Sequence, residues 1–105
     1  MNFKVRLTRE ADADLDRLFD LVLERELLRA GGDLELAKRA LDAIRAGFVT
    51  LKTSPFTCRK AGKGPFLREL LIPFGRSGYV ALIEIESAES VVVVAVRHQL
   101  EDDYH

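Results

Sequence analysis

The stretch that decides the fold is Pro65–His98, which reads PFLRELLIPFGRSGYVALIEIESAESVVVVAVRH. It contains three apolar segments, 66–70, 78–83 and 91–96, separated by residues that favour turns. The last segment is an unbroken run of valine and alanine. Valine packs well in a pleated sheet but loses rotamer freedom in a helix. We therefore expect three consecutive strands, of which the last is central and buried on both faces.

The N-terminal part of the chain predicts a strand followed by a helix. Phe3, Val5 and Leu7 alternate with polar residues, which is the period of a strand with one face on the core. Thr8 is suited to cap the next helix, and acidic residues follow in its first turn, where the helix dipole favours them. The apolar stripe of this helix consists of Ala11, Leu15, Leu18, Phe19 and Val22. The pair Gly31–Gly32 is expected to end the helix.

A second helix follows, and Asp33 is expected to cap it. Its apolar residues recur at alternating steps of four and three and line one seam: Ala37, Leu41, Ile44, Phe48 and Leu51. We expect Ile44 and Phe48 to face the sheet. The predicted fold is α+β, a single domain over residues 1–105. It has an N-terminal strand, an antiparallel helical hairpin and a three-stranded antiparallel meander, with the helices on one face of a mainly antiparallel sheet.

Composition restricts the possible functions. The chain has 105 residues, a net charge of −1 and a pI of about 6.1, so a nucleic-acid contact would need a local basic patch. Its single cysteine, Cys58, cannot form an internal disulfide, and we interpret it as an ordinary loop residue. No signal peptide is visible, and no apolar run approaches the roughly 20 residues that span a bilayer. We expect a cytoplasmic protein with no membrane partner, no metal ion and no cofactor.

The candidate binding residues are cations near the predicted strands. They are Arg59, Lys60 and Lys63 in the loop 53–65, Arg68 on a strand, and Arg97 and His98 directly after the valine-rich strand. A strand that emerges from the core into solvent holds its last side chains rigidly against a partner. Two of these residues also have structural interpretations: Arg68 as an ion-pair partner, and His98 as a hydrogen-bonded residue at the strand exit.

Short motifs along the chain resemble the RelE/ParE toxin superfamily. They are Val5-x-Leu7-Thr8, Ala11 with Asp14-Leu15, Leu51 with Ser54-Pro55, Leu67-Arg68-Glu69-Leu70, Tyr79, and Val94-x-Val96-Arg97-His98. The chain is most similar to the ParE branch, whose members are often described as plasmid stabilisation proteins. The resemblance implies a bacterial type II toxin that is neutralised by a small ParD-like antitoxin. It also implies that the target is DNA gyrase, inhibited by binding rather than by catalysis.

The RelE-like branch gives an alternative function. Its members cleave ribosome-bound mRNA without a metal ion, which requires an acid, a base and cations around the phosphate. The candidates for these catalytic roles are Arg68, Arg97, His98 and Tyr104. Carboxylates at Glu101, Asp102 and Asp103 would repel an RNA phosphate within a Debye length of about 8 Å. We therefore favour the ParE-like function, and with it a protein without intrinsic catalysis.

A third possibility is a degenerate member that binds partners without being toxic. Leu21, Leu28, Leu70 and Leu71 give both faces of their elements apolar character, more than one two-layer core needs. Extra exposed apolar area indicates an interface. We expect these four leucines to contact the antitoxin, and the cations named above to contact the target.

Overall fold

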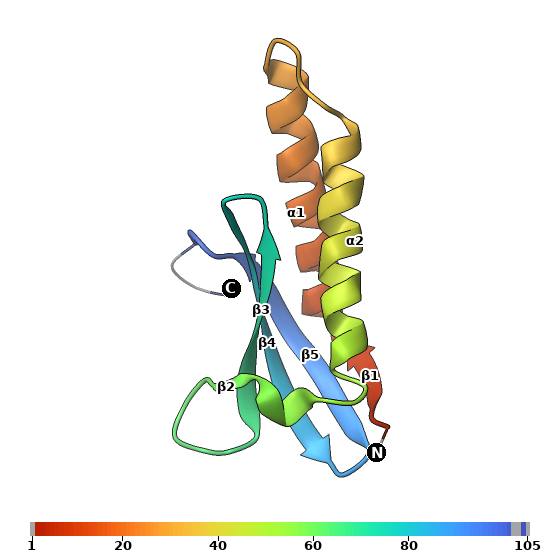
Figure 1. Ribbon diagram of the computed structural model, residues 1–105, viewed down its shortest axis with the longest axis vertical. Coiled ribbons are helices and arrows are strands. Elements are labelled where there is room, and N and C mark those ends of the chain that lie inside the picture. Colours follow the sequence, from red (N-terminus) through yellow and green to blue (C-terminus); the bar gives the residue numbers. More distant parts are fainter. Residues whose placement is uncertain (1, 102–103, 105) are drawn as a thin grey trace.

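The computed structural model describes residues 2–101 and 104 and has two layers (Figure 1). The elements in chain order are β1 (Lys4–Leu7), α1 (Arg9–Leu28), α2 (Glu35–Thr50), the short 3-10 helix η1 (Pro55–Thr57), β2 (Arg59–Lys60), β3 (Leu67–Phe74), β4 (Ser77–Ser87) and β5 (Ser90–His98). The antiparallel hairpin of α1 and α2 covers one face of a five-stranded sheet. The predicted α+β fold is confirmed.

The strand order is β1-β5-β4-β3-β2. Strands β3, β4 and β5 form the predicted antiparallel meander, and the valine-rich β5 is paired on both sides. Three details differ from the expectation. The middle strand is β4, the short edge strand β2 pairs with β3, and β1 runs parallel to β5. The parallel pairing is possible because the helices provide the long crossover that parallel strands require.

Helix α1 begins where the sequence predicts, with Thr8 as its N-cap, whereas the N-cap of α2 is Leu34, one residue after the expected Asp33. The Thr8 hydroxyl accepts a hydrogen bond from the Ala11 N–H at 3.1 Å, and the Asp33 carboxylate accepts one from the Glu35 N–H at 3.0 Å. Gly31 adopts a φ of 73° in the turn between the helices, a conformation that favours glycine. The local signals of this hairpin therefore agree with its tertiary structure. In the part of the chain that is described, no helix is long and apolar enough to cross a membrane.

The core lies between the helical hairpin and the sheet. Ile44 and Phe48 of α2 are buried as predicted, with exposed fractions of 1% and 7%. Gly47 lets α2 approach β3 closely, because a Cβ atom at this position would lie 2.9 Å from Cγ1 of Ile72. The hairpin thus packs tightly on the sheet through the contact of α2 with β3.

A β-bulge at Val94 changes the register of β5. Val93 lies opposite Ile83 of β4, and Ala95 lies opposite the β4 residue immediately before Ile83, so Val94 has no partner in the register. The Thr8 hydroxyl donates a hydrogen bond to the Val94 carbonyl at 2.9 Å. The start of α1 therefore holds the bulge in place.

The bulge decides which residues at the end of β5 face the helices. An extra residue in one strand reverses the alternation of side chains beyond it. His98 consequently lies opposite Tyr79, on the face that packs against the helices, while Arg97 lies opposite Val80 on the other face. The two residues that the sequence analysis placed in one candidate site are directed to opposite sides of the sheet.

Candidate functional site

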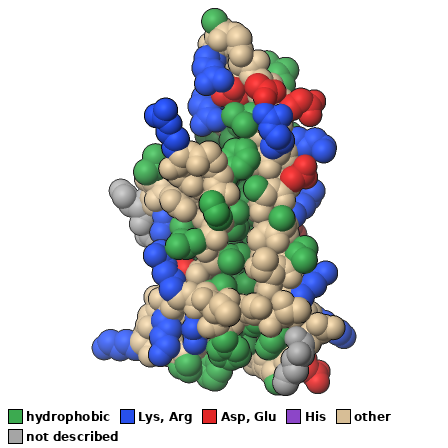
Figure 2. Space-filling view, viewed as in Figure 1, with side chains coloured by type: hydrophobic (Ala, Val, Ile, Leu, Met, Phe, Trp, Pro, Cys, Tyr) green, Lys and Arg blue, Asp and Glu red, His purple; other side chains and the backbone are tan. Residues whose placement is uncertain are grey.

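A groove of about 720 Å³ lies between the helical hairpin and the β3–β4 turn. Its apolar lining consists of Leu18, Leu21 and Val22 of α1, Leu36 of α2, Phe74 of β3 and Tyr79 of β4. Figure 2 shows hydrophobic side chains along the boundary between the helices and this turn. We call this feature the groove, and its lining can accommodate apolar side chains of a partner.

Charged side chains also line the groove. Arg17 and Arg25 come from α1, Arg76 comes from the β3–β4 turn, and Glu101 follows β5. Arg17 pairs with Glu101 at 3.2 Å and Arg25 pairs with Glu26 at 3.2 Å. Arg76 is exposed and has no acidic partner among the described residues. Arg76 therefore leaves a positive charge in the groove that suits an amphipathic segment carrying an acidic residue.

His98 lies in the groove and is held by the protein itself. Its Nε2 lies 3.0 Å from the Ser77 hydroxyl oxygen, and its Nδ1 accepts a hydrogen bond from the Leu100 N–H at 3.1 Å. Because Nδ1 accepts, the neutral ring carries its proton on Nε2 and donates it to Ser77. The ring also packs edge-on against Tyr79, with centroids 5.5 Å apart. This environment fits the interpretation of His98 as a hydrogen-bonded structural residue, since both ring nitrogens have partners within the protein.

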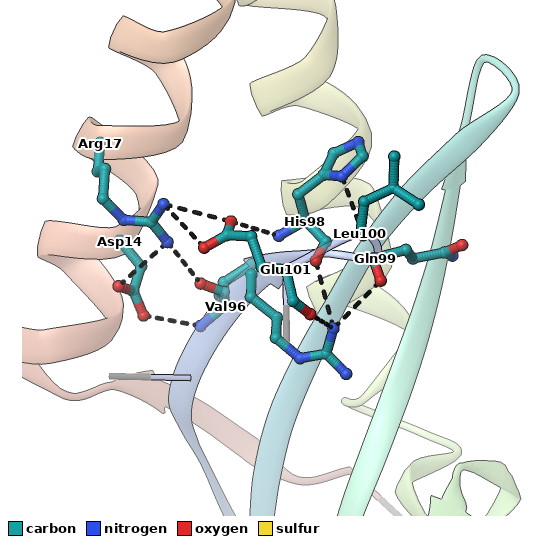
Figure 3. Close-up of polar contacts among 8 residues, drawn as sticks. Asp14, Arg17, Val96, His98, Gln99, Leu100 and Glu101 are labelled. Atoms are coloured by element: carbon teal, nitrogen blue, oxygen red, sulfur yellow. Dashed lines mark hydrogen bonds and ion pairs between the residues drawn. The ribbon is translucent and has the colours of Figure 1, made fainter. Parts of the chain in front are cut away.

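The turn after β5 is fixed by three charged residues (Figure 3). The Glu101 carboxylate accepts hydrogen bonds from the His98 N–H at 2.9 Å and from the Arg17 guanidinium at 3.2 Å. The Arg97 guanidinium donates to the Glu101 carbonyl at 2.7 Å. Glu101 is therefore neutralised by Arg17, while the other carboxylates expected to repel RNA, Asp102 and Asp103, lie outside the described residues.

A second charged cluster lies on the face of the sheet away from the helices. Glu69 pairs with Arg59 at 3.0 Å and with Arg97 at 4.0 Å, and it accepts a hydrogen bond from the Tyr104 hydroxyl. The Arg97 guanidinium lies 4.9 Å from the centroid of the Tyr104 ring. Burial, with a further contribution from Glu69, raises the pKa of Tyr104 well above its usual value. Tyr104 is therefore a neutral hydrogen-bond donor, and the side chain of Arg97, 15% exposed, is tied to the tail and to Glu69.

Arg68 lies on the opposite face from its neighbour Glu69 and has a structural role. Its guanidinium donates hydrogen bonds to the carbonyls of Pro65, Phe56 and Cys58 at 2.7, 3.1 and 2.8 Å. The expected ion pair is thus replaced by bonds to backbone oxygens.

Cys58 lies in the bend between η1 and β2, as its interpretation as a loop residue predicted, but the segment around it is not polar throughout. Its side chain is buried in the core, with an exposed fraction of 8%. Burial is the main cause that raises the pKa of the Cys58 thiol. Sequence reasoning missed this because two cations directly follow Cys58 and made the segment look polar throughout.

The predicted target-binding cations are not gathered in one place. Arg59 and Arg97 lie at Glu69, His98 lines the groove, and Arg68 binds the carbonyls near η1. Lys60 and Lys63 are exposed at the loop between β2 and β3. Successive side chains on a strand point to opposite faces, so cations that are neighbours in sequence become separated in space.

The four predicted antitoxin-binding leucines are also distributed over several surfaces. Leu21 is 51% exposed in the groove, and Leu28 is 90% exposed at the end of α1. Leu71 is 48% exposed on the face of the sheet away from the helices, whereas Leu70 packs against the core. Sequence reasoning missed Arg17 and Arg76 as residues of the groove, although the turn Gly75-Arg76 between two strands was a usable signal.

The fold and the groove define a small two-layer α+β protein with an open, partly apolar groove, and the comparisons specify its family. Residues 5–103 match the model of the family described as "ParE toxin of type II toxin-antitoxin system, parDE". The chain belongs to this family, as its resemblance to the ParE branch predicted. No curated protein matches the chain.

A solved structure shows the same fold. It is a chain of the "Chromosomal ParDE TA system from P. aeruginosa", with a TM-score of 0.70 and 20% sequence identity. The alignment covers 91% of this chain and 95% of that chain. The two-layer fold is therefore shared over almost the full length of both chains.

Proposed function

We propose that this protein is the toxin of a type II toxin–antitoxin pair, that it inhibits DNA gyrase by binding, and that a ParD-like antitoxin neutralises it in the cytoplasm. Membership of the ParE toxin family, matched over residues 5–103, is the observation that carries the proposal. No cofactor or metal ion has a part in it.

The arrangement of polar residues supports binding rather than RNA cleavage. Of the four candidate catalytic residues, Arg97 and Tyr104 lie together on one face of the sheet, and His98 lies on the other. Arg68 is used by backbone carbonyls, and both nitrogens of His98 have partners within the protein. A metal-independent ribonuclease needs its acid, base and cations around one phosphate. These four residues do not converge in that way.

The groove is the surface that we assign to the antitoxin. An amphipathic antitoxin helix would place apolar side chains against Leu21 and Phe74 and acidic side chains near Arg25 and Arg76. Burying one leucine contributes about 1.5–3 kcal/mol, so a few such contacts supply most of a stable complex. This assignment keeps Leu21 from the predicted set and adds the arginines of the groove to it.

Two measurements test the toxic activity. Expression of the chain without its antitoxin should arrest growth, and co-expression of the antitoxin should restore it. Purified protein should make gyrase accumulate cleaved DNA while ribosome-bound mRNA stays intact. Absence of growth arrest in a folded, soluble protein would favour the degenerate binding module instead.

His98→Gln separates the two toxic mechanisms. A ribonuclease that uses imidazole as acid or base should lose roughly 10²–10⁴-fold in rate. A toxin that acts by binding should keep most of its potency, and Ser77→Ala is the matched control because it removes a hydrogen-bond partner of the same ring. Ribosome-dependent cleavage that collapses in His98→Gln but survives in Ser77→Ala would establish the RelE-like alternative.

A further inference from the structure

Charge is unevenly distributed along this nearly neutral chain. The segment 43–68 contains six of the sixteen Lys and Arg residues and none of the seventeen Asp and Glu residues. The rest of the chain is consequently acidic. A local basic patch of this kind is what a nucleic-acid contact requires in a protein without a basic net charge.

Two exposed aromatic rings lie within the same segment. Phe56 of η1 and Phe66 before β3 are 50% and 53% exposed, and their rings meet edge to face with centroids 6.5 Å apart. The Arg68 guanidinium lies 5.3 Å from the centroid of the Phe56 ring and donates hydrogen bonds to the carbonyls of Phe56 and Pro65. Arg68 therefore holds the two chain segments that carry the rings.

Two lysines, Lys60 at the end of β2 and Lys63 in the β2–β3 loop, accompany the rings. Lys60 and Lys63 are exposed and have no acidic partner among the described residues, whereas Arg59 is paired with Glu69. The Ala61 N–H donates a hydrogen bond to the Leu67 carbonyl at 2.9 Å, which closes the loop beside Phe66. At this lower end of the molecule, Figure 2 shows hydrophobic side chains next to Lys and Arg side chains. We call Phe56, Lys60, Lys63 and Phe66 the loop surface.

We propose that the loop surface binds single-stranded DNA. Proteins that bind single strands without sequence preference combine cations that follow the phosphates with aromatic side chains on which bases stack. The choice of DNA over RNA rests on the proposed function, in which the target is an enzyme that acts on DNA. Glu84 is an exposed carboxylate opposite Leu67 and weakens the positive field at this end. We therefore expect binding in the range of non-specific affinities, about 10⁻⁴–10⁻⁶ M.

The test is fluorescence anisotropy of a labelled oligothymidylate with the purified full chain and no gyrase, at several salt concentrations. Phe66→Ala should weaken binding roughly 5- to 150-fold, the contribution of stacking one base. Phe66→Tyr should keep the affinity because it keeps the ring. Phe66→Leu keeps apolar bulk without a π face, so it should behave like Phe66→Ala if bases stack there.

Charge variants give a second, independent readout. Lys63→Glu should weaken binding and reduce the slope of log affinity against log salt by at least about 0.7, the value for one phosphate contact on a single strand. Lys38→Glu makes the same change of net charge and is the control, since Lys38 is exposed near the start of α2, at the opposite end of the hairpin from η1, where it pairs with Asp42 at 3.5 Å. Gly62→Lys should strengthen binding because it adds a positive charge to the loop. The loop has room for the side chain, since a Cβ at Gly62 meets no atom within 4 Å.

Several results would overturn the proposal. The first is no binding of oligothymidylate at low salt. The second is an affinity equal to that of wild type in both Phe66→Ala and Lys63→Glu. The third is binding of oligouridylate or duplex DNA in place of oligothymidylate. Loss of antitoxin affinity in Phe66→Ala without oligonucleotide binding would instead assign the surface to a protein partner. The gyrase assay is separate: a wild-type chain that binds the oligonucleotide but leaves gyrase unaffected would contradict the proposed target, and not the DNA contact.

Discussion

The carboxylate of Asp14 in α1 accepts a hydrogen bond from the backbone N–H of Val96 in β5 at 2.8 Å. Asp14 is 4% exposed and lies 3.8 Å from the Arg17 guanidinium. A buried carboxylate is stable when it is hydrogen-bonded and paired in this way. The contact fastens the start of the hairpin to β5 just beyond the bulge, and so to the end of the strand that carries Arg97 and His98.

Asp14→Ala should destabilise the fold by about 1–3 kcal/mol, because the buried Val96 N–H loses its acceptor. Asp14→Asn keeps an acceptor oxygen and should lose less. Urea unfolding measures both, and Asp16→Ala on the exposed side of the same helix is the control, expected within about 0.5 kcal/mol of wild type. Equal stability of Asp14→Ala and Asp16→Ala would show that the contact contributes nothing.

Phe48→Ala should cost about 3–5 kcal/mol through the cavity that it leaves under the sheet. Domains of this size have a total stability of about 5–15 kcal/mol, so the variant should be partly unfolded at room temperature. Val49→Ala changes the next residue of the same helix, which is 57% exposed, and should melt close to wild type. A small shift in the melting temperature for Phe48→Ala would contradict the packing of α2 described above.

Leu21→Glu should weaken the antitoxin complex more than Leu28→Glu does. Leu21 lines the groove, whereas Leu28 lies at the end of α1 and is 90% exposed. Losing one buried leucine removes about 1.5–3 kcal/mol of binding free energy, before any effect of the new charge. Isothermal titration of both variants with the antitoxin decides the question, and a larger loss in Leu28→Glu would move the interface to the tip of the hairpin.

Glu26 links the stability of the hairpin to pH. Its buried carboxylate accepts hydrogen bonds from the Asp33 N–H at 3.1 Å and from Arg29 at 2.8 Å. The bond from Asp33 is the largest cause that lowers the pKa of Glu26 below its usual 4.5. Because the folded-state pKa is lowered, this stabilisation is fully present above pH 4.5 and is lost as pH falls through the folded-state value.

Glu26→Gln should therefore be less stable than wild type at neutral pH, and the difference should shrink as the pH falls below 4.5. Glutamine keeps an acceptor oxygen for the Asp33 N–H but cannot form an ion pair with arginine. Thermal unfolding of both proteins across acidic pH measures the difference. A gap that stays constant with pH would show that the effect of Glu26 does not depend on its charge.

The sequence by itself determined the two helices, the four longer strands and most of the core. The alternating steps of four and three in α2 predicted that Ile44 and Phe48 face the sheet, and both are buried. Thr8 was recognised as the cap of α1 because its side chain can accept one of the first free N–H groups of a helix, and Asp33, one residue before the N-cap of α2, accepts the Glu35 N–H. These signals are local, so each can be read from a few neighbouring residues.

Tertiary structure decided which residues meet at the surface. Strict alternation along β5 would have placed Arg97 on the same face as Val91 and Val93, toward the helices. The bulge at Val94, held by the hydroxyl of Thr8, reverses this alternation and turns His98 into the groove and Arg97 toward Glu69. A bulge leaves no clear mark in a run of valines, since it depends on contacts between residues that are distant along the chain.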